Sequence, residues 1–351
     1  MNSKERMLGM LKGNKVDRIP VTPHWWGVYK FQLSGKASGY LDEPKCWALS
    51  GKDLAEVDSL FYETFKPDLF HLNCGPGILR DKYRRKKTNE LAQRVKLLNS
   101  KADIDEYVDL AYLSADEIRH DRIYDHVRQL ASIYGNEVFI AVNEGNPICQ
   151  ILDPNGIFGF EEGLIALLEK PNMMAYLIYR EYEKMTEKLI VLSEYGCHAY
   201  IGSETYCSAD IISPKMYRDL IFPAHKNFYQ KVKDTGILPI VYFLGDINPL
   251  IDDINRMGVA ALLVEESKKT FVLDVIDIRK RLSPDITLFG NLDSVYTLLK
   301  GTREEVVAET KKQLEAARYG SFVMANGCPV AFDTPKENIL AMIETARAFQ
   351  V

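Results

Sequence analysis

Residues 198–246 read HAYIGSETYCSADIISPKMYRDLIFPAHKNFYQKVKDTGILPIVYFLGD, and the pattern of this stretch indicates the fold class. It opens with a short apolar run, His198–Glu204, and closes with another, Leu238–Asp246. Neither run alternates strictly between apolar and polar residues, which is typical of parallel strands buried on both faces. Residues Tyr217–Lys233, between the two runs, have a helical pattern. The stretch therefore predicts a strand, a helix and a second, parallel strand.

The same alternation of short runs and helical patterns recurs along the whole chain. No glycine-rich fingerprint follows the first run and no P-loop is present, which argues against a Rossmann domain. Helical patterns lie between the runs, for example at Glu161–Leu168, Pro171–Leu192 and Arg303–Arg318. Eight predicted strands favour an α/β fold, a single (β/α)8 TIM barrel over residues 1–351. These strands are Ile19–Trp25, Asp68–Cys74, Val138–Glu144, His198–Glu204, Leu238–Asp246, Ala261–Glu266, Thr287–Asp293 and Ser321–Cys328.

The longest interval between predicted strands is residues 75–137, which we interpret as an insertion after the second strand. It contains the basic sequence DKYRRKKTNE at residues 81–90. Such a charge run predicts a solvated hairpin or loop, and contact with an anionic ligand or an acidic partner is the alternative. Its cations are Lys82, Arg84, Arg85, Lys86 and Lys87.

Bulk composition restricts the classes of partner. A net charge of −5 and a pI near 5.8 argue against a nucleic-acid or membrane-surface binder. The first residues lack the apolar core of a signal peptide, and no run approaches the length of a membrane span. Six cysteines without a CxxC pair do not form a disulfide framework. We therefore expect a cytoplasmic protein with reduced thiols.

Polar side chains gather where the predicted strands end, and barrel enzymes carry their chemistry at that end. The set is rich in hydrogen-bond acceptors and poor in cations, so it predicts a polar cavity. In chain order it comprises His24, Trp25, Trp26, His71, Asn73, Cys74, Asn143, Glu144, Glu204, Tyr206, Cys207, Tyr242, Asp246, Glu265, Glu266, Asn291, Asp293, Asn326 and Cys328.

Among these residues, Glu144 and Glu204 are the hardest to explain as structural. A carboxylate that ends a buried strand costs free energy unless it is paired, solvated or bound to a cation. We favour Glu204 for proton transfer or metal ligation. His71 alternates with apolar neighbours, so we expect it to point outward into the helix layer. Structural alternatives are a backbone hydrogen bond for His24 and a small buried hydrophobe for Cys207.

Four segments resemble the uroporphyrinogen decarboxylase superfamily, which holds the decarboxylase itself and the corrinoid-linked methyltransferases. The resemblance spans most of the chain and implies the barrel fold predicted above. The segments are KERMLGMLKGNKVDRIPV (4–21), GCHAYIGSETYCSADIISPKMYRDLIFPAHK (196–226), FGNLDSVYTLLKGTREEV (289–306) and NGCPVAFDTPKENI (326–339).

Three departures from the family pattern argue against tetrapyrrole decarboxylation. The decarboxylases carry arginines after the first strand, which suit a substrate with many carboxylates. This chain has PHWWGVYKFQLSG (23–35) there, with Lys30 as its cation. The decarboxylases' essential aspartate aligns with Asn73, and their C-terminal histidine aligns with Cys328.

The methyltransferase branch implies zinc on a His-x-Cys pair after the fifth strand and on a cysteine after the eighth. Cys328 matches the last ligand, whereas Tyr242 and Leu244 stand at the other two positions. Two readings stay open. Zinc is rebuilt from other groups, or no metal binds and carboxylates with Tyr242 act as general acid or base. The rebuilt ligands would come from Cys328, Glu204, His24 and Cys207, with Cys74 and Glu144 as further candidates.

The function that the resemblance implies is methyl transfer between a small methylated substrate and a separate corrinoid protein. Methoxyarenes, methylamines and thiols are the substrate classes considered. The aromatic pair Trp25–Trp26 suits a flat substrate or a quaternary ammonium, with a buried interface as its alternative. Alternative functions are decarboxylation of a tetrapyrrole or smaller carboxylate, and a non-catalytic binding barrel. The resemblance also makes a homodimer an expected state.

The predicted site divides by role. The expected catalytic residues are Glu204, Tyr242 and Asp246. The expected substrate-binding residues are His24, Trp25, Trp26, Asn73, Glu144, Tyr206 and Asn291.

Overall fold

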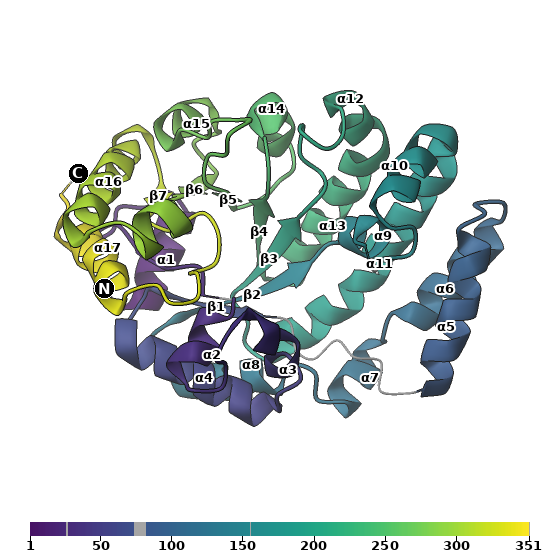
Figure 1. Cartoon of the computed structure of the whole chain (residues 1–351), viewed down its shortest axis with the longest axis horizontal. Helices are drawn as coiled ribbons and strands as arrows, with labels where there is room; N and C mark the ends of the chain where they lie inside the picture. The colour runs from purple at the N-terminus through teal and green to yellow at the C-terminus, as the bar shows by residue number, and fades with distance from the viewer. Residues whose placement is uncertain (26, 74–81, 155, 351) are drawn as a thin grey trace.

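The computed structural model describes residues 1–25, 27–73, 82–154 and 156–350, and a parallel β-sheet forms its centre (Figure 1). The sheet has seven strands in chain order, each parallel to the next. The strands are β1 (Leu69–Asn73), β2 (Phe139–Gly145), β3 (Ala199–Glu204), β4 (Leu238–Phe243), β5 (Ala261–Val264), β6 (Thr287–Phe289) and β7 (Phe322–Val323). The register runs from Ala199 opposite Leu238 to Glu204 opposite Phe243, which confirms the strand pair predicted from residues 198–246.

The first of the eight predicted strands, Ile19–Trp25, does not form. Val21 makes a single parallel bridge to Met324, next to β7. The backbone nitrogen of Asp68, next to β1, donates to the carbonyl of Val21 at 2.9 Å. The segment thus bonds to both edges of the sheet without becoming a strand. Prolines at positions 20 and 23 flank this bridge and remove two backbone donors from any longer ladder.

A buried carboxylate holds this segment in place. Asp68 accepts hydrogen bonds from Arg6 and Arg18, each at 2.7 Å, and from the backbone nitrogen of Val21 at 2.9 Å. Two arginines offset the cost of burying the Asp68 charge. The contact ties the N-terminal helix and the bridging segment to the start of β1.

Helices cover the outside of the sheet (Figure 1). The predicted helices at 161–168, 171–192, 217–233 and 303–318 all form, with boundaries that differ by a few residues. None of the helices in the described ranges is both long enough and apolar enough to cross a bilayer. The α-helices are α1 (Ser3–Leu11), α2 (Tyr29–Leu33), α3 (Glu43–Cys46), α4 (Gly51–Phe65), α5 (Lys82–Val95), α6 (Lys101–Ala111), α7 (Ala115–His120), α8 (Asp125–Tyr134), α9 (Pro147–Leu152), α10 (Phe160–Glu169), α11 (Pro171–Glu194), α12 (Pro214–Met216), α13 (Phe222–Asp234), α14 (Ile251–Asn255), α15 (Val275–Arg281), α16 (Arg303–Leu314) and α17 (Lys336–Ala348). Shorter or wider helical turns are η1 (Tyr40–Asp42), η2 (Tyr217–Ile221), η3 (Asn248–Leu250), η4 (Ser294–Leu299) and η5 (Glu315–Tyr319).

The basic run after β1 is helical rather than a loop or hairpin. Residues 82–95 form α5, which packs against α6. Lysine, arginine, glutamate, glutamine, alanine and leucine dominate this segment, and all are strong helix formers. The prediction was wrong because it considered the charge of the run and not its helix propensity.

Side chains from the sheet enter two separate cores. One core lies inside the curved sheet and receives alternate residues of every strand from β1 to β7, such as Ile201 and Ile240. Met7, Met10 and Leu11 of α1 join the same core. The other core lies between the sheet and the surrounding helices and contains Tyr200. Because neighbouring residues of a strand point to opposite faces, each strand supplies both cores.

Candidate active site at the carboxyl ends of the strands

The direction of each side chain at the strand ends follows from the alternation of residues along a strand between the inner and the outer core. In β3, Ala199 and Ile201 belong to the inner core and Tyr200 to the outer one. Ser203 therefore faces the interior, and Glu204 faces the helices. The hydroxyl of Ser203 donates to Asn143 Oδ1 of β2 at 2.8 Å, across that interior. The same reasoning places the side chains of His71, Asn73, Tyr242 and Glu265 on the inner side.

Two histidines lie in the interior just below the strand ends. His24 and His71 are fully buried, and their ring centroids lie 5.0 Å apart. The outward orientation expected of His71 is thus wrong, because its neighbours Phe70 and Leu72 occupy the outer core instead. Burial lowers the pKa of His24 to about 3 and that of His71 well below its usual value. Both rings are therefore neutral near pH 7, and their nitrogens lack well-formed hydrogen bonds.

Tyr242 stands beside His24, with ring centroids 5.4 Å apart. Its hydroxyl donates to the backbone carbonyl of Gly327 at 2.6 Å. Burial, reinforced by the nearby Cys328, raises the pKa of Tyr242 well above 10.0. The phenol is therefore protonated and already committed as a donor.

A hydrogen-bond network positions the residues around Cys328. Asn326 accepts from the backbone nitrogen of His24 at 2.8 Å and donates to Ser294 Oγ at 3.0 Å. The Ser294 hydroxyl donates to the Cys328 carbonyl at 2.7 Å. Asn326 also donates to that carbonyl. These bonds connect the segment at residues 19–25, the loop after β6 and the residues that follow β7.

Cys328 lies against two carboxylates and a lysine that follow β5. Its Sγ is 3.6 Å from Glu265 Oε1. Lys268 Nζ lies 2.9 Å from Glu265 Oε1, 2.8 Å from Glu266 Oε1 and 4.0 Å from Cys328 Sγ. Cys328, Glu265 and Glu266 have the donor types and spacing that could hold a metal ion. Burial and the two carboxylates raise the pKa of the Cys328 thiol, so the thiol is protonated.

The close approach of Cys328 to these carboxylates depends on Gly327. A Cβ atom at this position would clash with the backbone nitrogen and Oε2 of Glu266. Only glycine lets the end of β7 approach the end of β5 so closely. We refer to Cys328, Glu265, Glu266 and Lys268 together as the mouth cluster. Sequence reasoning named the first three as strand-end residues and missed Lys268. Its place two residues after Glu266 was the available signal.

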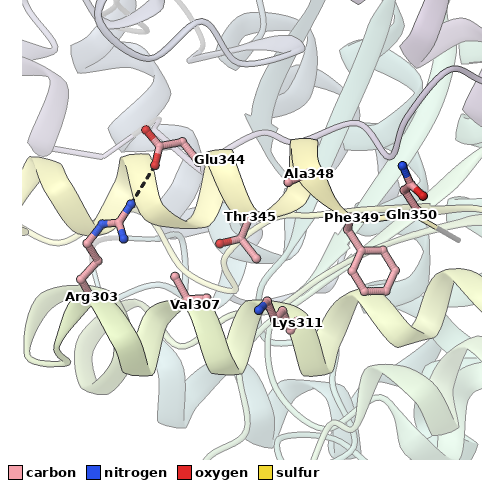
Figure 2. Close-up of a pocket in the computed structure, with 8 residues that line it drawn as sticks. All are labelled: Arg303, Val307, Lys311, Glu344, Thr345, Ala348, Phe349 and Gln350. Atoms are coloured by element: carbon pink, nitrogen blue, oxygen red, sulfur yellow. Dashed lines mark hydrogen bonds and ion pairs between the residues drawn. The ribbon is translucent and has the colours of Figure 1, made fainter.

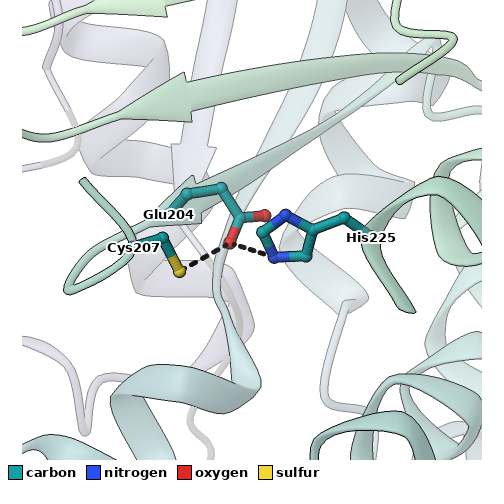
Figure 3. A group of neighbouring side chains, drawn as sticks. All are labelled: Glu204, Cys207 and His225. Atoms are coloured by element: carbon teal, nitrogen blue, oxygen red, sulfur yellow. Dashed lines mark hydrogen bonds and ion pairs between the residues drawn. The ribbon is translucent and has the colours of Figure 1, made fainter. Parts of the chain in front are cut away.

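Glu204 lies in a different, fully buried group that Figure 3 shows with Cys207 and His225. Glu204 Oε2 is 3.0 Å from His225 Nε2 and 3.9 Å from Cys207 Sγ. This trio is also a candidate metal group among the described residues, and it is separate from the mouth cluster. The structure therefore does not bring Cys328 together with Glu204 and Cys207.

Hydroxyl and amide donors from surrounding helices complete the environment of Glu204. Tyr229 of α13 donates to Oε1 at 2.7 Å, and Tyr182 of α11 donates to Oε2 at 3.0 Å. Asn146 donates to Oε2 at 2.5 Å. Burial alone would raise the pKa of Glu204, but His225 and these donors lower it overall. The carboxylate is ionised, and both of its oxygens accept hydrogen bonds from neighbouring side chains.

The other predicted carboxylate, Glu144, is also paired on the outer side of the sheet. The Tyr124 hydroxyl donates to its Oε1 at 2.5 Å. Lys188 of α11 contacts Oε2 at 2.7 Å. Glu144 is thus buried and neutralised rather than exposed to the interior.

The remaining predicted residues support the mouth or lie away from it. Trp25 packs on Phe61 at a centroid distance of 4.1 Å and belongs to the outer core. Asn291 donates to the carbonyls of Glu265 and Leu273, each at 2.9 Å, and so braces the loop after β5.

Asp246 and Tyr206 lie in turns after their strands. Asp246 accepts from the backbone nitrogen of Asn248 at 3.0 Å, at the start of η3. Tyr206 is half-buried and lies 5.8 Å from the ring of Phe160. The predicted Trp26 and Cys74 lie outside the described residues.

Lys30, the cation of residues 23–35, is not free to bind an anionic substrate at the strand ends. It is 1% exposed, and its Nζ bonds to Asp58 Oδ1 at 2.7 Å and to Asn73 Oδ1 at 3.2 Å. The ammonium is therefore neutralised by Asp58, and it orients the amide of Asn73.

Two cavities of the described residues lie elsewhere. Figure 2 shows one of about 600 Å³ between α16 and α17, bordered by the Arg303–Glu344 ion pair. A second, of about 310 Å³, is lined by residues near the N-terminus, including Arg6 and Arg18. Neither contains a residue of the predicted site.

Comparison with known proteins gives a consistent family. Residues 82–349 match the family model described as uroporphyrinogen decarboxylase (URO-D). The chain is 31% identical over 150 residues to the methylcobamide:CoM methyltransferase MtaA of Methanosarcina barkeri, covering 43% of this chain and 41% of that protein. It thus spans less than half of that relative's length. The match to MtbA of Methanosarcina mazei is 23% identical over 365 aligned positions and covers 99% of this chain and 98% of MtbA.

Matches to uroporphyrinogen decarboxylases cover 40–52% of the chain, a range that includes the MtaA match, whereas the MtbA match covers 99%. The uroporphyrinogen decarboxylase of Crocosphaera subtropica is 22% identical over 159 residues, covering 42% of this chain and 43% of that protein. A solved methyltransferase from Methanosarcina mazei has a TM-score of 0.75 at 19% identity and covers 99% of this chain and 98% of its own. At that identity the likeness concerns the fold, and it supports a barrel of this type.

Proposed function

The chain belongs to the uroporphyrinogen decarboxylase family, nearer its methyltransferases than its decarboxylases, and we propose that it transfers a methyl group between a small methylated compound and a corrinoid-bearing partner protein. The relatives named as methylcobamide:CoM methyltransferases support this proposal. A corrinoid on the docked partner would supply the acceptor or donor of the methyl group. The residues of this chain bind and orient the small compound.

The observation that carries the proposal is the lack of a free cation at the described part of the mouth. A tetrapyrrole with many carboxylates needs fixed positive charges to hold it. Lys30 is neutralised by Asp58, and Lys268 is neutralised by two glutamates. His24 and His71 are neutral because they are buried. A neutral or weakly polar methyl compound suits these walls better than a polycarboxylate does.

The zinc site that the family resemblance implies does not fit these residues. Leu244 offers no ligand atom, and the Tyr242 hydroxyl is protonated and bonded to Gly327. The carboxylates beside Cys328 already hold Lys268. We therefore route no step through a metal ion at the mouth.

In the proposed reaction, this chain supplies orientation and exclusion of water. His24, His71 and Tyr242 would form the floor under the methyl compound, and the mouth cluster would form one wall. The interior core below them keeps water away from the floor. Holding two reactants in place can supply a large part of a rate enhancement, which suits a site with few free acids and bases.

The test is a methyl-transfer assay with purified protein and cob(I)alamin in place of the partner. Methoxyarenes, methylamines and methylated thiols are offered in turn, and the loss of cob(I)alamin absorbance is followed. The reverse reaction, from methylcobalamin to a free thiol, is measured alongside. We expect enzyme-dependent transfer with at least one class.

The decarboxylase alternative is tested on the same preparation. Release of carbon dioxide from a porphyrinogen, without methyl transfer in either direction, would replace the proposal with the family's other chemistry.

A further inference from the structure

We propose that Lys268 occupies the cation position of the mouth, where its ammonium takes the place of a divalent metal ion and meets the electron-rich heteroatom of the substrate. The first half concerns the protein alone. The second half, on the substrate, rests on the proposed function.

Position and charge support the first half. Lys268 Nζ lies within 2.9 Å of one oxygen from each of Glu265 and Glu266, so the ammonium bridges two carboxylates as a metal ion would. The side chains of Glu265 and Glu266 are 14% and 6% exposed. Carboxylates this buried need a cation beside them. Lys268 lies two residues after Glu266, so the chain itself supplies this cation.

The net charge of the mouth cluster is the same with the Lys268 ammonium as it would be with a divalent metal ion in its place. Two carboxylates, one ammonium and a neutral thiol sum to −1, and two carboxylates, one divalent ion and a thiolate also sum to −1. The ammonium therefore replaces the charge of a metal ion without altering the electrostatic balance.

One atom of the cluster still points to a ligand. Glu266 is 4% exposed, and its Oε2 has no hydrogen-bond partner among the described residues. A buried carboxylate oxygen without a partner costs free energy and marks spare capacity to bind a donor or a cation. If the ammonium were removed, two carboxylates and Cys328 would be left with the donor set and spacing of a metal site.

The substrate half follows from the exposure of Lys268. Its side chain is 40% exposed, so the ammonium is accessible from solvent while it stays bonded to the glutamates. An ammonium carries three donors, and two are directed at carboxylates. The third faces Cys328 Sγ at 4.0 Å, a long contact that the sulfur or oxygen that loses its methyl group can replace. This donor would stabilise negative charge that develops on the atom through one charge-assisted hydrogen bond, while the two glutamates keep the ammonium from acting as a free cation for a polycarboxylate.

A cobalt(II) titration tests the first half, because thiolate ligation of Co²⁺ gives a charge-transfer absorption. We expect no Cys328-dependent band in the wild type. In Lys268→Met the band should appear, with an affinity for Co²⁺ on the order of 100-fold higher, since one opposing charge has been removed. Lys268→Met combined with Cys328→Ser should lose the band.

Two control variants test whether loss of the Lys268 charge causes the gain of Co²⁺ binding. Lys269→Met removes the neighbouring exposed lysine, which forms no ion pair with the described residues, and should behave as the wild type. Lys268→Arg keeps the charge and should also give no band. Thermal unfolding of each variant verifies the fold. A wild-type band that Cys328→Ser abolishes, or no gain of binding in Lys268→Met, overturns the first half.

Methyl transfer tests the second half. Lys268→Met should lower kcat/KM by about 100-fold, the size expected for loss of one charge-stabilising donor, while Lys269→Met keeps it. Equal rates in Lys268→Met and wild type overturn the substrate role and leave the proposed function standing. No transfer by the wild type would remove the proposed function and the substrate half with it, whereas the titration still decides the first half.

Discussion

Glu204 and Tyr242 end strands β3 and β4, yet their side chains enter different parts of the molecule. Tyr242 belongs to the inner core, and Glu204 bonds to residues of α11 and α13. The sequence placed both at strand ends but could not give their directions. Strand β3 is buried on both faces, so its apolar pattern carries no information on which face is inside. The proton-transfer role predicted for Glu204 remains a prediction, with a competing structural role.

The two roles of Glu204 predict different results for Glu204→Gln. The structural role predicts a loss of about 3 kcal/mol in the free energy of unfolding, because His225 would lose its buried partner. Urea unfolding measures it, and the exposed Glu162→Gln serves as control. Unchanged stability together with lost methyl transfer would instead support the catalytic role.

Glu181 of α11 predicts a pH dependence of stability. It is fully buried, and burial raises its pKa well above the ordinary 4.5, a shift that Tyr112 opposes. A carboxyl whose pKa is raised on folding binds its proton more tightly in the folded state. The contribution of Glu181 to the free energy of unfolding is complete below pH 4.5 and is lost as pH rises through the folded-state pKa.

We therefore expect Glu181→Gln to gain at least about 1 kcal/mol over the wild type at pH 8 relative to pH 5. Urea unfolding at the two pH values measures this difference. An identical pH dependence in both proteins would mean that Glu181 does not titrate in this way.

At the scale of elements, the end of β7 and the loop after β5 must approach each other for the mouth cluster to form. Gly327 permits this approach, so Gly327→Ala should separate Cys328 from Glu265 and Glu266. We expect methyl transfer to fall at least about tenfold and unfolding free energy to fall by about 1–3 kcal/mol, the usual cost of overpacking.

Gly39→Ala provides the matched control for the Gly327→Ala substitution. An added Cβ there meets no atom within 4 Å, so activity and stability should not change. Equal activity of Gly327→Ala and Gly39→Ala would show that the mouth cluster is not needed for the reaction.

The order and direction of the strands were predictable because each strand is a short apolar run between helical patterns. Seven of the eight predicted strands form in parallel and in chain order. The remaining one, Ile19–Trp25, does not form, since prolines flank the bridge at Val21 and limit its pairing. The helix α5 was missed for a different reason, because its charge was considered before its propensity.

At the scale of the whole molecule, the sequence identified which residues reach the strand ends but not how they group there. One of the two interpretations left open placed Cys328 with Glu204 and Cys207 in a rebuilt zinc site, whereas these residues belong to two separate groups. Such grouping depends on contacts between residues up to 63 positions apart, such as Cys328 and Glu265. No local pattern encodes those contacts. The resemblance to a family contributed the reaction class, and side-chain geometry then showed that the expected zinc ligands are missing.

The most direct test of the account is transfer of a ¹³C-labelled methyl group from the small compounds to cob(I)alamin, measured by mass spectrometry of the corrinoid. If the chain is a corrinoid-linked methyltransferase, labelled methylcobalamin forms only with enzyme and with at least one donor class. No label in the corrinoid with any donor, while the same preparation releases carbon dioxide from a porphyrinogen, would contradict it.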